Sequence, residues 1–249
     1  MKNKNNVLVT VRTKSSRLPE KCLLPFGNQC VLEHVIERCK LYKLEPIICT
    51  SIDPSDDRIV DIAKKYKVNY FRGSVVNKLL RWRDCCRKFN LNYFHSVDAD
   101  DPFFCGEEVL RSLDLFHSGN YDIVTPSPSS SNGGATVGYS LSRDIIEDAC
   151  EGLADDTDTE MMWTYIDRLK KLNKASLDDP IVAIITQRMT LDYHEDYILL
   201  ESVRLMLKHQ PSRTDIYKLF QDNPNLSDIN SFRNEEWAVN QKNKMFKET

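Results

Sequence analysis

Short apolar runs alternate with amphipathic stretches through the first half of the chain, and this alternation restricts the possible folds more than any other feature. Strands are expected at residues 7–11, 46–50, 68–71, 93–97 and 121–125. The stretches between them have helical periodicity at residues 31–41, 56–66, 77–89 and 107–116. Strands that alternate with helices in this way are typical of βαβ units around a parallel sheet. We therefore expect an α/β protein with a mainly parallel twisted sheet.

The second half differs from the first in composition. The segment PSPSSSNGG, which begins at Pro126, is too rich in Pro, Ser and Gly to favour regular structure. Beyond this loop we expect a strand at 136–141, helices at 143–151 and 160–172, and one or two strands in the apolar run 180–190. Further helices are expected at 195–208, 214–220 and 234–245. No internal repeat or linker divides the chain, so residues 1–249 are expected to form a single domain.

Composition narrows the class of protein. With 249 residues and 41% hydrophobic content, the chain can bury a sizeable core. Its 34 basic and 37 acidic residues give a net charge of −3, which provides no broad positive field for nucleic acid. No apolar run approaches the roughly 20 residues of a membrane-spanning helix, and the opening MKNKNN lacks a cleavage-site pattern. We expect a cytoplasmic protein that binds neither nucleic acid nor membranes.

A cationic loop, Arg-Thr-Lys-Ser-Ser-Arg-Leu-Pro-Glu-Lys, follows the first expected strand at residues 12–21. Loops at the carboxyl ends of parallel strands face the crevice where open α/β sheets bind ligands. Arginine, lysine and backbone N–H groups in such a loop suit a triphosphate. The alternative is a solvated basic turn. Neither the GxxxxGK[ST] pattern nor GxGxxG is present, so the loop is of neither common phosphate-binding type.

The loop and its surroundings resemble the signature of the cytidylyltransferases that activate bacterial surface sugars. The similarity is chiefly to the spore-coat polysaccharide type, with CMP-Kdo synthetase and acylneuraminate cytidylyltransferase as relatives. The family pattern is approximately A-R-x-G-S-x-R-L-P-G-K, followed by L-x-x-V-I-E-R; this chain has VRTKSSRLPEK and then VLEHVIER. Lys14 and Glu20 stand where the family has glycine. The segments CTSIDPSDD, FRGS and DYHEDY continue the resemblance in the same order.

The resemblance implies a Rossmann-like nucleotide-diphospho-sugar transferase fold and a site for a nucleoside triphosphate, expected to be CTP. No protein nucleophile is needed, because a hydroxyl of the sugar attacks the α-phosphorus and pyrophosphate leaves. Arg12 and Lys21 are the expected catalytic residues, since their charges would stabilise the leaving group. By the same resemblance, the nucleotide would be bound by Arg12, Ser15, Arg17, Lys21, Thr50, Ser51, Gly73 and Ser74.

Two aspartates far apart in the sequence are the candidate ligands of Mg²⁺. Asp100, in the run DADDP, matches the metal-binding position of the family's G-D-x-P, and Asp192 matches the second aspartate of the family. Mg²⁺ is usually held by one or two carboxylates together with phosphates and water. Taken singly, the acidic run is also typical of a helix start, and Asp192 of a helix cap. With the basic loop upstream, the pair favours coordination of Mg²⁺.

The sugar site is expected in the second half, where the resemblance implies roles for Gly134, Thr136 and Glu160. The segment NGGATVG replaces the acidic residues of the family's P-x-G-L-D-V-E pattern, which indicates a sugar other than that of a standard relative. The implied reaction is transfer of CMP from CTP to a surface-glycan sugar, such as a nonulosonic or related acid. The alternatives are a nucleotide-binding descendant without turnover, and a nucleotidyltransferase for a different sugar or base.

The resemblance also implies a homodimer, because the relatives commonly form one. Residues 126–190 would include the sugar-site loop and a projecting arm. The apolar residues expected to be exposed on this arm need a partner surface. They are Ile181, Val182, Ile184 and Ile185.

Overall fold

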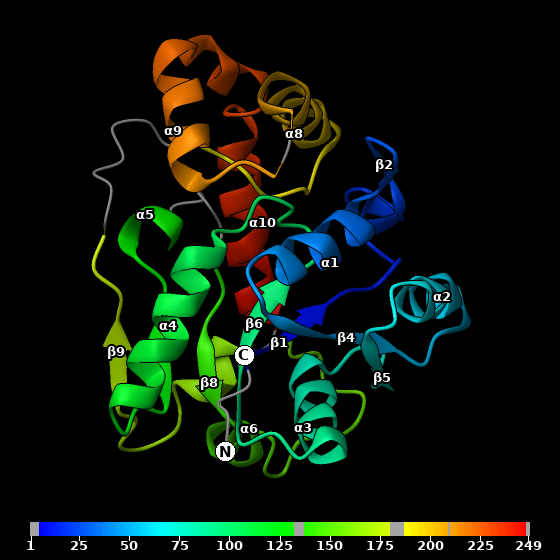
Figure 1. The fold of residues 1–249 in the computed structure, drawn as a ribbon. Coiled ribbons are helices and arrows are strands. Elements are labelled where there is room, and N and C mark those ends of the chain that lie inside the picture. Colours follow the sequence, from blue (N-terminus) through cyan, green and yellow to red (C-terminus); the bar gives the residue numbers. More distant parts are fainter. Residues whose placement is uncertain (1–4, 132–136, 180–186, 209, 248–249) are drawn as a thin grey trace.

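A computed structural model describes residues 5–131, 137–179, 187–208 and 210–247, and within these residues seven strands form one sheet (Figure 1). Their order is β5-β4-β1-β6-β8-β7-β9. Only β8 runs antiparallel to its neighbours, β6 and β7, so the expected mainly parallel α/β sheet is confirmed. The strands are β1 Asn6–Thr10, β4 Glu45–Ser51, β5 Asn69–Gly73, β6 Tyr93–Asp98, β7 Ile123–Thr125, β8 Ser140–Ser142 and β9 Lys174–Ser176.

Helices cover both faces of the sheet, because successive residues of a strand point to opposite faces. Val7 and Val9 of β1 pack in one cluster with α1 (Val31–Leu41), α2 (Asp57–Lys65) and α4 (Gly106–Ser118). Leu8 lies in the other cluster, with α3 (Lys78–Phe89), α6 (Arg143–Ala149) and α7 (Trp163–Ile166). The near-continuous apolar runs in the sequence are therefore explained by strands that are buried on both sides.

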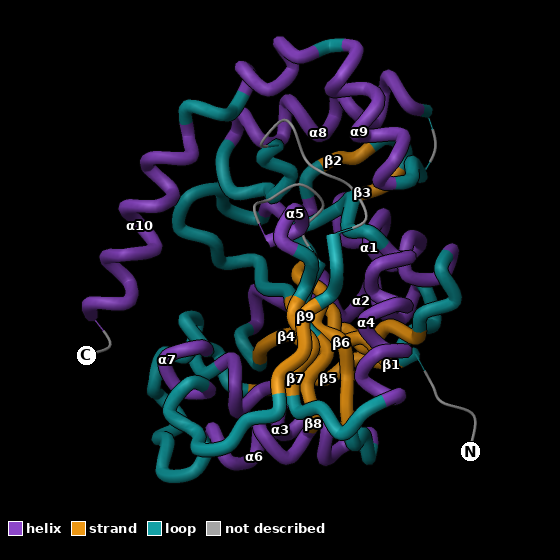
Figure 2. Tube along the Cα trace, turned by 90° about the vertical axis from the view of Figure 1, so that its left-hand side faces the viewer, coloured by secondary structure: helices purple, strands orange, loops and turns teal. Residues whose placement is uncertain are grey.

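The C-terminal helices form a further layer beyond one end of the sheet (Figures 1 and 2). This layer contains α8 (His194–Leu207), α9 (Arg213–Asp222), η3 (Pro224–Ile229) and α10 (Arg233–Lys247). Phe26, from the segment between β1 and α1, and Phe103, from the loop after β6, pack with Leu199 and Val203 of α8 in a third apolar cluster. Figure 2 shows α10 extending from this layer along one side of the molecule. The late part of the chain is thus packed over the loops that follow the strands.

The second half differs from the sequence expectations in three places. The helix expected at 160–172 is limited to α7, and the chain turns after it, with Lys171 in a left-handed conformation (φ 66°), to enter the unexpected strand β9. The serine-rich segment contains a short helix, α5 (Pro128–Ser131). The strand expected at 136–141 is β8, which begins four residues later and ends one residue later. The run 180–186, and with it the expected arm, lies outside the described residues.

Several smaller elements were also not expected, namely η1 (Lys21–Leu23), β2 (Pro25–Phe26), β3 (Gln29–Cys30) and η2 (Pro54–Asp56).

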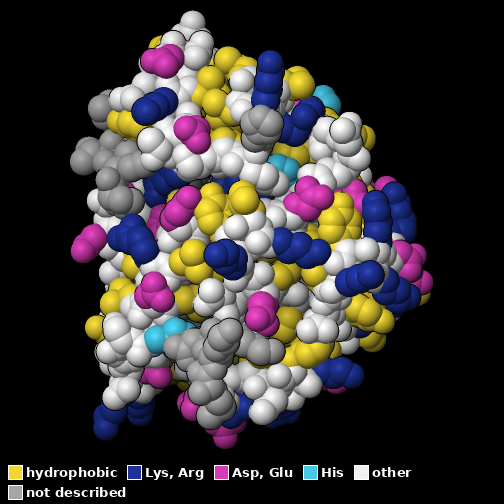
Figure 3. All heavy atoms as spheres, in the orientation of Figure 1, with side chains coloured by type: hydrophobic (Ala, Val, Ile, Leu, Met, Phe, Trp, Pro, Cys, Tyr) yellow, Lys and Arg dark blue, Asp and Glu magenta, His cyan; other side chains and the backbone are white. Residues whose placement is uncertain are grey.

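On the face drawn in Figure 3, basic and acidic side chains are interspersed. In the part of the chain that the structure describes, no helix combines the length and the apolar character that crossing a membrane requires.

Candidate active site

Seven of the predicted site residues meet beside the loops that follow β1, β5 and β6. The parallel register places Thr10 beside both Cys49 and Asp98, so these strands end at one edge of the sheet. The chain adds β4 and β5 on one side of β1 and then crosses back to add β6 on the other, and ligands bind at such a point. A pocket opens there. The sequence-predicted residues that line it are Arg12, Ser15, Arg17, Lys21, Asp100, Glu160 and Asp192.

The loop after β1 is held in place by Asp56, which is buried at the start of α2. Asp56 Oδ1 accepts hydrogen bonds from the Thr13 N–H (2.8 Å) and hydroxyl (2.7 Å), and Oδ2 accepts from the hydroxyls of Thr50 (3.1 Å) and Ser51 (2.5 Å). Burial acts to raise the pKa of Asp56, but these donors outweigh it and the pKa is lowered. Thr50 and Ser51 are therefore turned toward Asp56, where they support the loop, and they do not line the pocket.

Glu20 keeps a backbone conformation that glycine would normally supply. Its φ is 55° and its ψ is 22°, in the left-handed region. The Glu20 N–H donates to the Thr13 carbonyl at 2.9 Å, and the Glu20 carbonyl accepts from the Leu23 N–H at 2.7 Å, which closes the loop. The second glycine replacement, Lys14, pairs with Asp53 at 2.5 Å. Both substitutions are thus accommodated without opening the loop.

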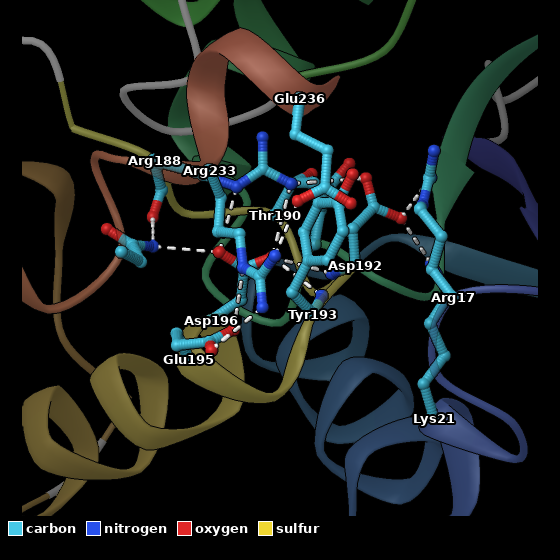
Figure 4. A network of polar contacts seen from close by, with 12 residues as sticks. Arg17, Lys21, Arg188, Thr190, Asp192, Tyr193, Glu195, Asp196, Arg233 and Glu236 are labelled. Carbon is cyan, nitrogen blue, oxygen red and sulfur yellow. Dashed lines mark hydrogen bonds and ion pairs between the residues drawn. The ribbon is translucent and has the colours of Figure 1, made fainter. Parts of the chain in front are cut away.

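Lys21 lies between the two aspartates that were predicted to bind metal. Its Nζ is 2.6 Å from Asp100 Oδ2 and 2.9 Å from Asp192 Oδ1. Arg17 Nη2 lies 2.6 Å from the same oxygen of Asp192. Figure 4 shows Arg17 and Lys21 on one side of Asp192, reaching it from the loop after β1. The structure therefore brings together four of the predicted residues, from three distant parts of the sequence.

Two hydrogen bonds, one between main-chain groups and one between side chains, fix the two aspartate segments against each other. The Leu191 N–H donates to the Asp100 carbonyl at 2.8 Å, and the Thr190 hydroxyl donates to Asp101. Because these bonds join the residues beside both aspartates, the spacing of Asp100 and Asp192 is set by the backbone and does not depend on Lys21 alone.

The charges in the cluster shift one another's titration. Burial would raise the pKa of Asp192, but Lys21 and Arg17 outweigh this effect and hold it at about 2. Burial acts to lower the pKa of Lys21, and the two carboxylates reverse the sign, so that its pKa is raised. The pKa of Asp100 is raised by desolvation, against the opposing charge of Lys21. At neutral pH we therefore expect a charged lysine facing an ionised Asp192.

The carboxylates suit a divalent cation. Oxygens of Asp98, Asp100 and Asp101 lie within 4.8 Å of one another, and Asp192 faces Asp100 across a single ammonium group. Carboxylate oxygens are the ligands that Mg²⁺ prefers, and an adjoining pocket leaves room for phosphate and water. Asp100 and Asp192 thus fit the predicted metal site.

The other predicted residues do not all lie at this centre. Arg12 lines the pocket and donates to the Val75 carbonyl at 2.6 Å. Gly73 ends β5, and a Cβ there would come within 2.7 Å of the Phe71 ring, so the position needs glycine for packing. The Ser74 hydroxyl donates to the Asp155 carbonyl and does not line the pocket. Gly134 and Thr136 lie outside the described residues.

Sequence reasoning missed two kinds of functional candidate. Lys78 lines the pocket and pairs at 3.3 Å with Asp98 of the acidic run DADDP, which lines it too. The place of Lys78 at the start of α3 could have indicated this. Arg188 and Asp196, by contrast, contact Asp192 from the protein side, and no local pattern indicated such a role for Arg188.

Comparison with known proteins identifies sequences and folds that are similar to this chain. Residues 6–137, more than half of the chain, match a family model described as cytidylyltransferase. The chain is 27% identical to an uncharacterized protein of Methanocaldococcus jannaschii over 234 residues, which cover 90% of this chain and 93% of that protein. It is also 27% identical to the 3-deoxy-manno-octulosonate cytidylyltransferase of Rickettsia canadensis over 126 residues, 48% of this chain and 50% of that enzyme.

Two solved structures have a similar fold. One is a cytidylyltransferase from Leptospira borgpetersenii (TM-score 0.80, 22% identity), with 90% of this chain and 97% of that one covered. The other is CMP:2-keto-3-deoxy-manno-octonic acid synthetase complexed with CTP (TM-score 0.61, 13% identity, 83% and 99% covered). At these identities the likeness concerns the fold, whereas the family model concerns the sequence. Because that model matches more than half of the chain and includes the pocket loop, this protein belongs to the cytidylyltransferase family.

Proposed function

We propose that this protein transfers CMP from CTP to a hydroxyl of a surface-glycan sugar, such as a nonulosonic or related acid, with release of pyrophosphate. The observation that carries the proposal is the meeting of Arg17, Lys21, Asp100 and Asp192 at one pocket. Cations for a triphosphate and carboxylates for a metal are the two requirements of nucleotidyl transfer. The CTP bound to a structural relative supports the choice of nucleotide.

In this reaction a sugar oxygen bonds to the α-phosphorus, the bond from that phosphorus to the bridging oxygen breaks, and the hydroxyl proton passes to solvent. Arg12 and Lys21 would stabilise the negative charge that grows on pyrophosphate as this bond breaks. Ser15 and Arg17 would hold the phosphates in line for the attack. Bound Mg²⁺, held by Asp100 and Asp192, would neutralise phosphate oxygens and polarise the phosphorus.

The sugar would be bound beside the phosphates. Glu160 lines the pocket. Burial acts to lower the pKa of Arg17, but Asp192, with smaller contributions from Tyr193 and Glu160, outweighs it and the pKa is raised. We assign Gly134 and Thr136 to the same sugar site on the resemblance alone.

The alternative of a binding protein without turnover is less well supported by the loop geometry. Its premise is that Lys14 and Glu20 disturb a loop that needs glycine. Glu20 nevertheless has the left-handed backbone, and Lys14 is paired with Asp53, away from the carboxylate cluster. Arg12, Arg17 and Lys21, the cations that match the family loop, all line the pocket.

A pyrophosphate-release assay with each of the four common nucleoside triphosphates and a panel of acidic sugars tests the proposal. We expect release with CTP, an acidic sugar and Mg²⁺, and none when any of these is omitted. Binding of CTP without release across a broad panel would favour the binding protein. Release with another nucleotide would show that the assignment of the base is wrong.

A further inference from the structure

The two carboxylate oxygens of Asp192 have different surroundings. Oδ1 faces the pocket loop and accepts from Arg17 (2.6 Å) and Lys21 (2.9 Å). Oδ2 faces the protein interior and lies 3.3 Å from Arg188 Nη2. Only 3% of Asp192 is exposed. In Figure 4, Asp192 lies between Arg17 and Arg188, so its carboxylate is held from both sides.

Asp196, in the first turn of α8, organises the interior side. It is completely buried and accepts hydrogen bonds from the N–H groups of Asp192 and Tyr193, both at 2.9 Å. Its side chain also accepts from Arg188 Nε at 2.8 Å and Nη2 at 3.1 Å. Arg188 therefore spans two carboxylates, and Asp196 fixes both the backbone of Asp192 and the arginine that contacts its side chain.

Asn230 joins this unit to the C-terminal part of the chain. Its Nδ2 donates to the Arg188 carbonyl and to Asp196 Oδ1, both at 2.9 Å, and its exposure is 1%. Asn230 follows η3 and lies far beyond residues 6–137, the part matched by the family model. The planar guanidinium of Arg188 is held between the carboxylates of Asp196 and Asp192, so it has little freedom to rotate. The Asp192 carboxylate that it contacts is therefore fixed as well.

We infer that Arg188, Asp196 and Asn230 are positioning residues that hold Asp192 with Oδ1 turned toward the pocket and thereby strengthen metal binding. This inference rests on the proposed function, because it takes Asp192 as a metal ligand. Residues that orient metal ligands from behind commonly change metal affinity by about 10- to 100-fold when they are replaced.

The test is the affinity for Mn²⁺ in the presence of CTP, measured from the electron paramagnetic resonance signal of free Mn²⁺. Asn230→Ala removes two hydrogen bonds but leaves Arg188 and Asp196 in place. Arg188→Lys keeps the charge but removes the fork that spans both carboxylates. Asn223→Ala is the matched control, because Asn223 lies in the same C-terminal part and donates only to Leu219 among the contacts the structure describes.

We expect Asn230→Ala and Arg188→Lys to bind Mn²⁺ at least about tenfold more weakly than the wild type. Their affinity for CTP without metal should stay unchanged, as should both affinities of Asn223→Ala. A loss of Mn²⁺ affinity without a loss of CTP affinity distinguishes a positioning role from a general loss of structure. The unfolded fraction of each variant is measured alongside.

Mn²⁺ affinities within twofold of the wild type in both variants would overturn the inference and leave the proposed function standing. A loss no larger than the unfolded fraction explains would also overturn it. If the wild type itself does not bind Mn²⁺ with CTP, the proposed function fails, and the inference fails with it.

Discussion

At the scale of single residues, Glu20 stands out because a side chain occupies a left-handed backbone position in the phosphate loop. Its φ of 55° is needed for the bond from its N–H to Thr13 and for the turn into η1. The carboxylate gains an exposed ion pair with Arg58 at 2.7 Å, which contributes little in water. The backbone at Glu20 is therefore slightly strained, at a position where the family pattern has glycine.

Glu20→Gly should accordingly stabilise the protein by about 1 kcal/mol, because glycine adopts this conformation without a steric penalty. Urea unfolding provides the measurement. Glu20→Ala is the control, since it removes the ion pair but keeps the Cβ. Equal stabilities of the two variants would show that the backbone at this position is not strained.

Asp192 should make the stability of the protein without metal depend on acid pH. Its pKa is about 2 in the folded protein, below the value of about 4 expected when unfolded. The stability it contributes is therefore complete above about pH 4 and is lost as the pH falls through about 2. At neutral pH this contribution is on the order of 2 kcal/mol.

Unfolding free energies of wild type and Asp192→Asn, measured in urea from pH 5 down to pH 2, check this expectation. The difference between them should shrink as the pH falls. Parallel pH profiles would mean that Lys21 and Arg17 do not lower the pKa of Asp192.

At the scale of elements, the first half of the fold was predictable because burial follows the strand and helix periods. α1 coincides with the expected helix at 31–41, and α3 begins one residue after the expected start. The second half was less predictable, because contacts distant in sequence decide it. The buried hydroxyls of α5 bond to Arg213 of α9 and Glu108 of α4, so a segment typical of a loop becomes helical.

The same limit applies to the site. The types and order of Arg17, Lys21, Asp100 and Asp192 were predictable from a resemblance in local motifs. The inward orientation of Thr50 and Ser51 was not, because it depends on the tertiary position of Asp56. The contacts of Arg188, Asp196 and Asn230 on the interior side of Asp192 could not be predicted from local sequence motifs either.

Arg213 can be substituted to test whether contacts between helices hold α5 in place. Its guanidinium lies 2.7 Å from Glu108, and both residues are buried. Arg213→Met should lower the unfolding free energy by about 3–5 kcal/mol, because it leaves a buried carboxylate without its cation. Arg111→Met, at an exposed position on α4, should change it by less than about 1 kcal/mol. Similar small effects of both changes would show that this pair does not anchor α5.

At the scale of the whole molecule, the site is assembled from the two ends of the chain. Lys21 and Asp192 are 171 residues apart, yet they are in direct contact. Asp192 lies just before the C-terminal layer, which supplies Asp196 and Asn230 behind it and packs on the sheet domain through Phe26 and Phe103. Removal of this layer is therefore expected to leave Asp192, half of the candidate metal site, without the Asp196 contact that holds its backbone.

We expect the protein to form a homodimer in solution, as the resemblance implies. Light scattering at micromolar concentration should give twice the chain mass of 28.9 kDa. A single species of 28.9 kDa would contradict this expectation.

The central claim is that CTP reacts at the cluster of Lys21, Asp100 and Asp192. Its most direct test is pyrophosphate release from CTP, in the presence of Mg²⁺ and the acidic sugar that the wild type uses, compared with Asp100→Asn. Asp57→Asn, on the exposed start of α2, is the control. We expect the rate of pyrophosphate release to fall by far more than tenfold in Asp100→Asn and to stay unchanged in the control. A rate within tenfold of the wild type, about 1.4 kcal/mol of barrier, would contradict the claim.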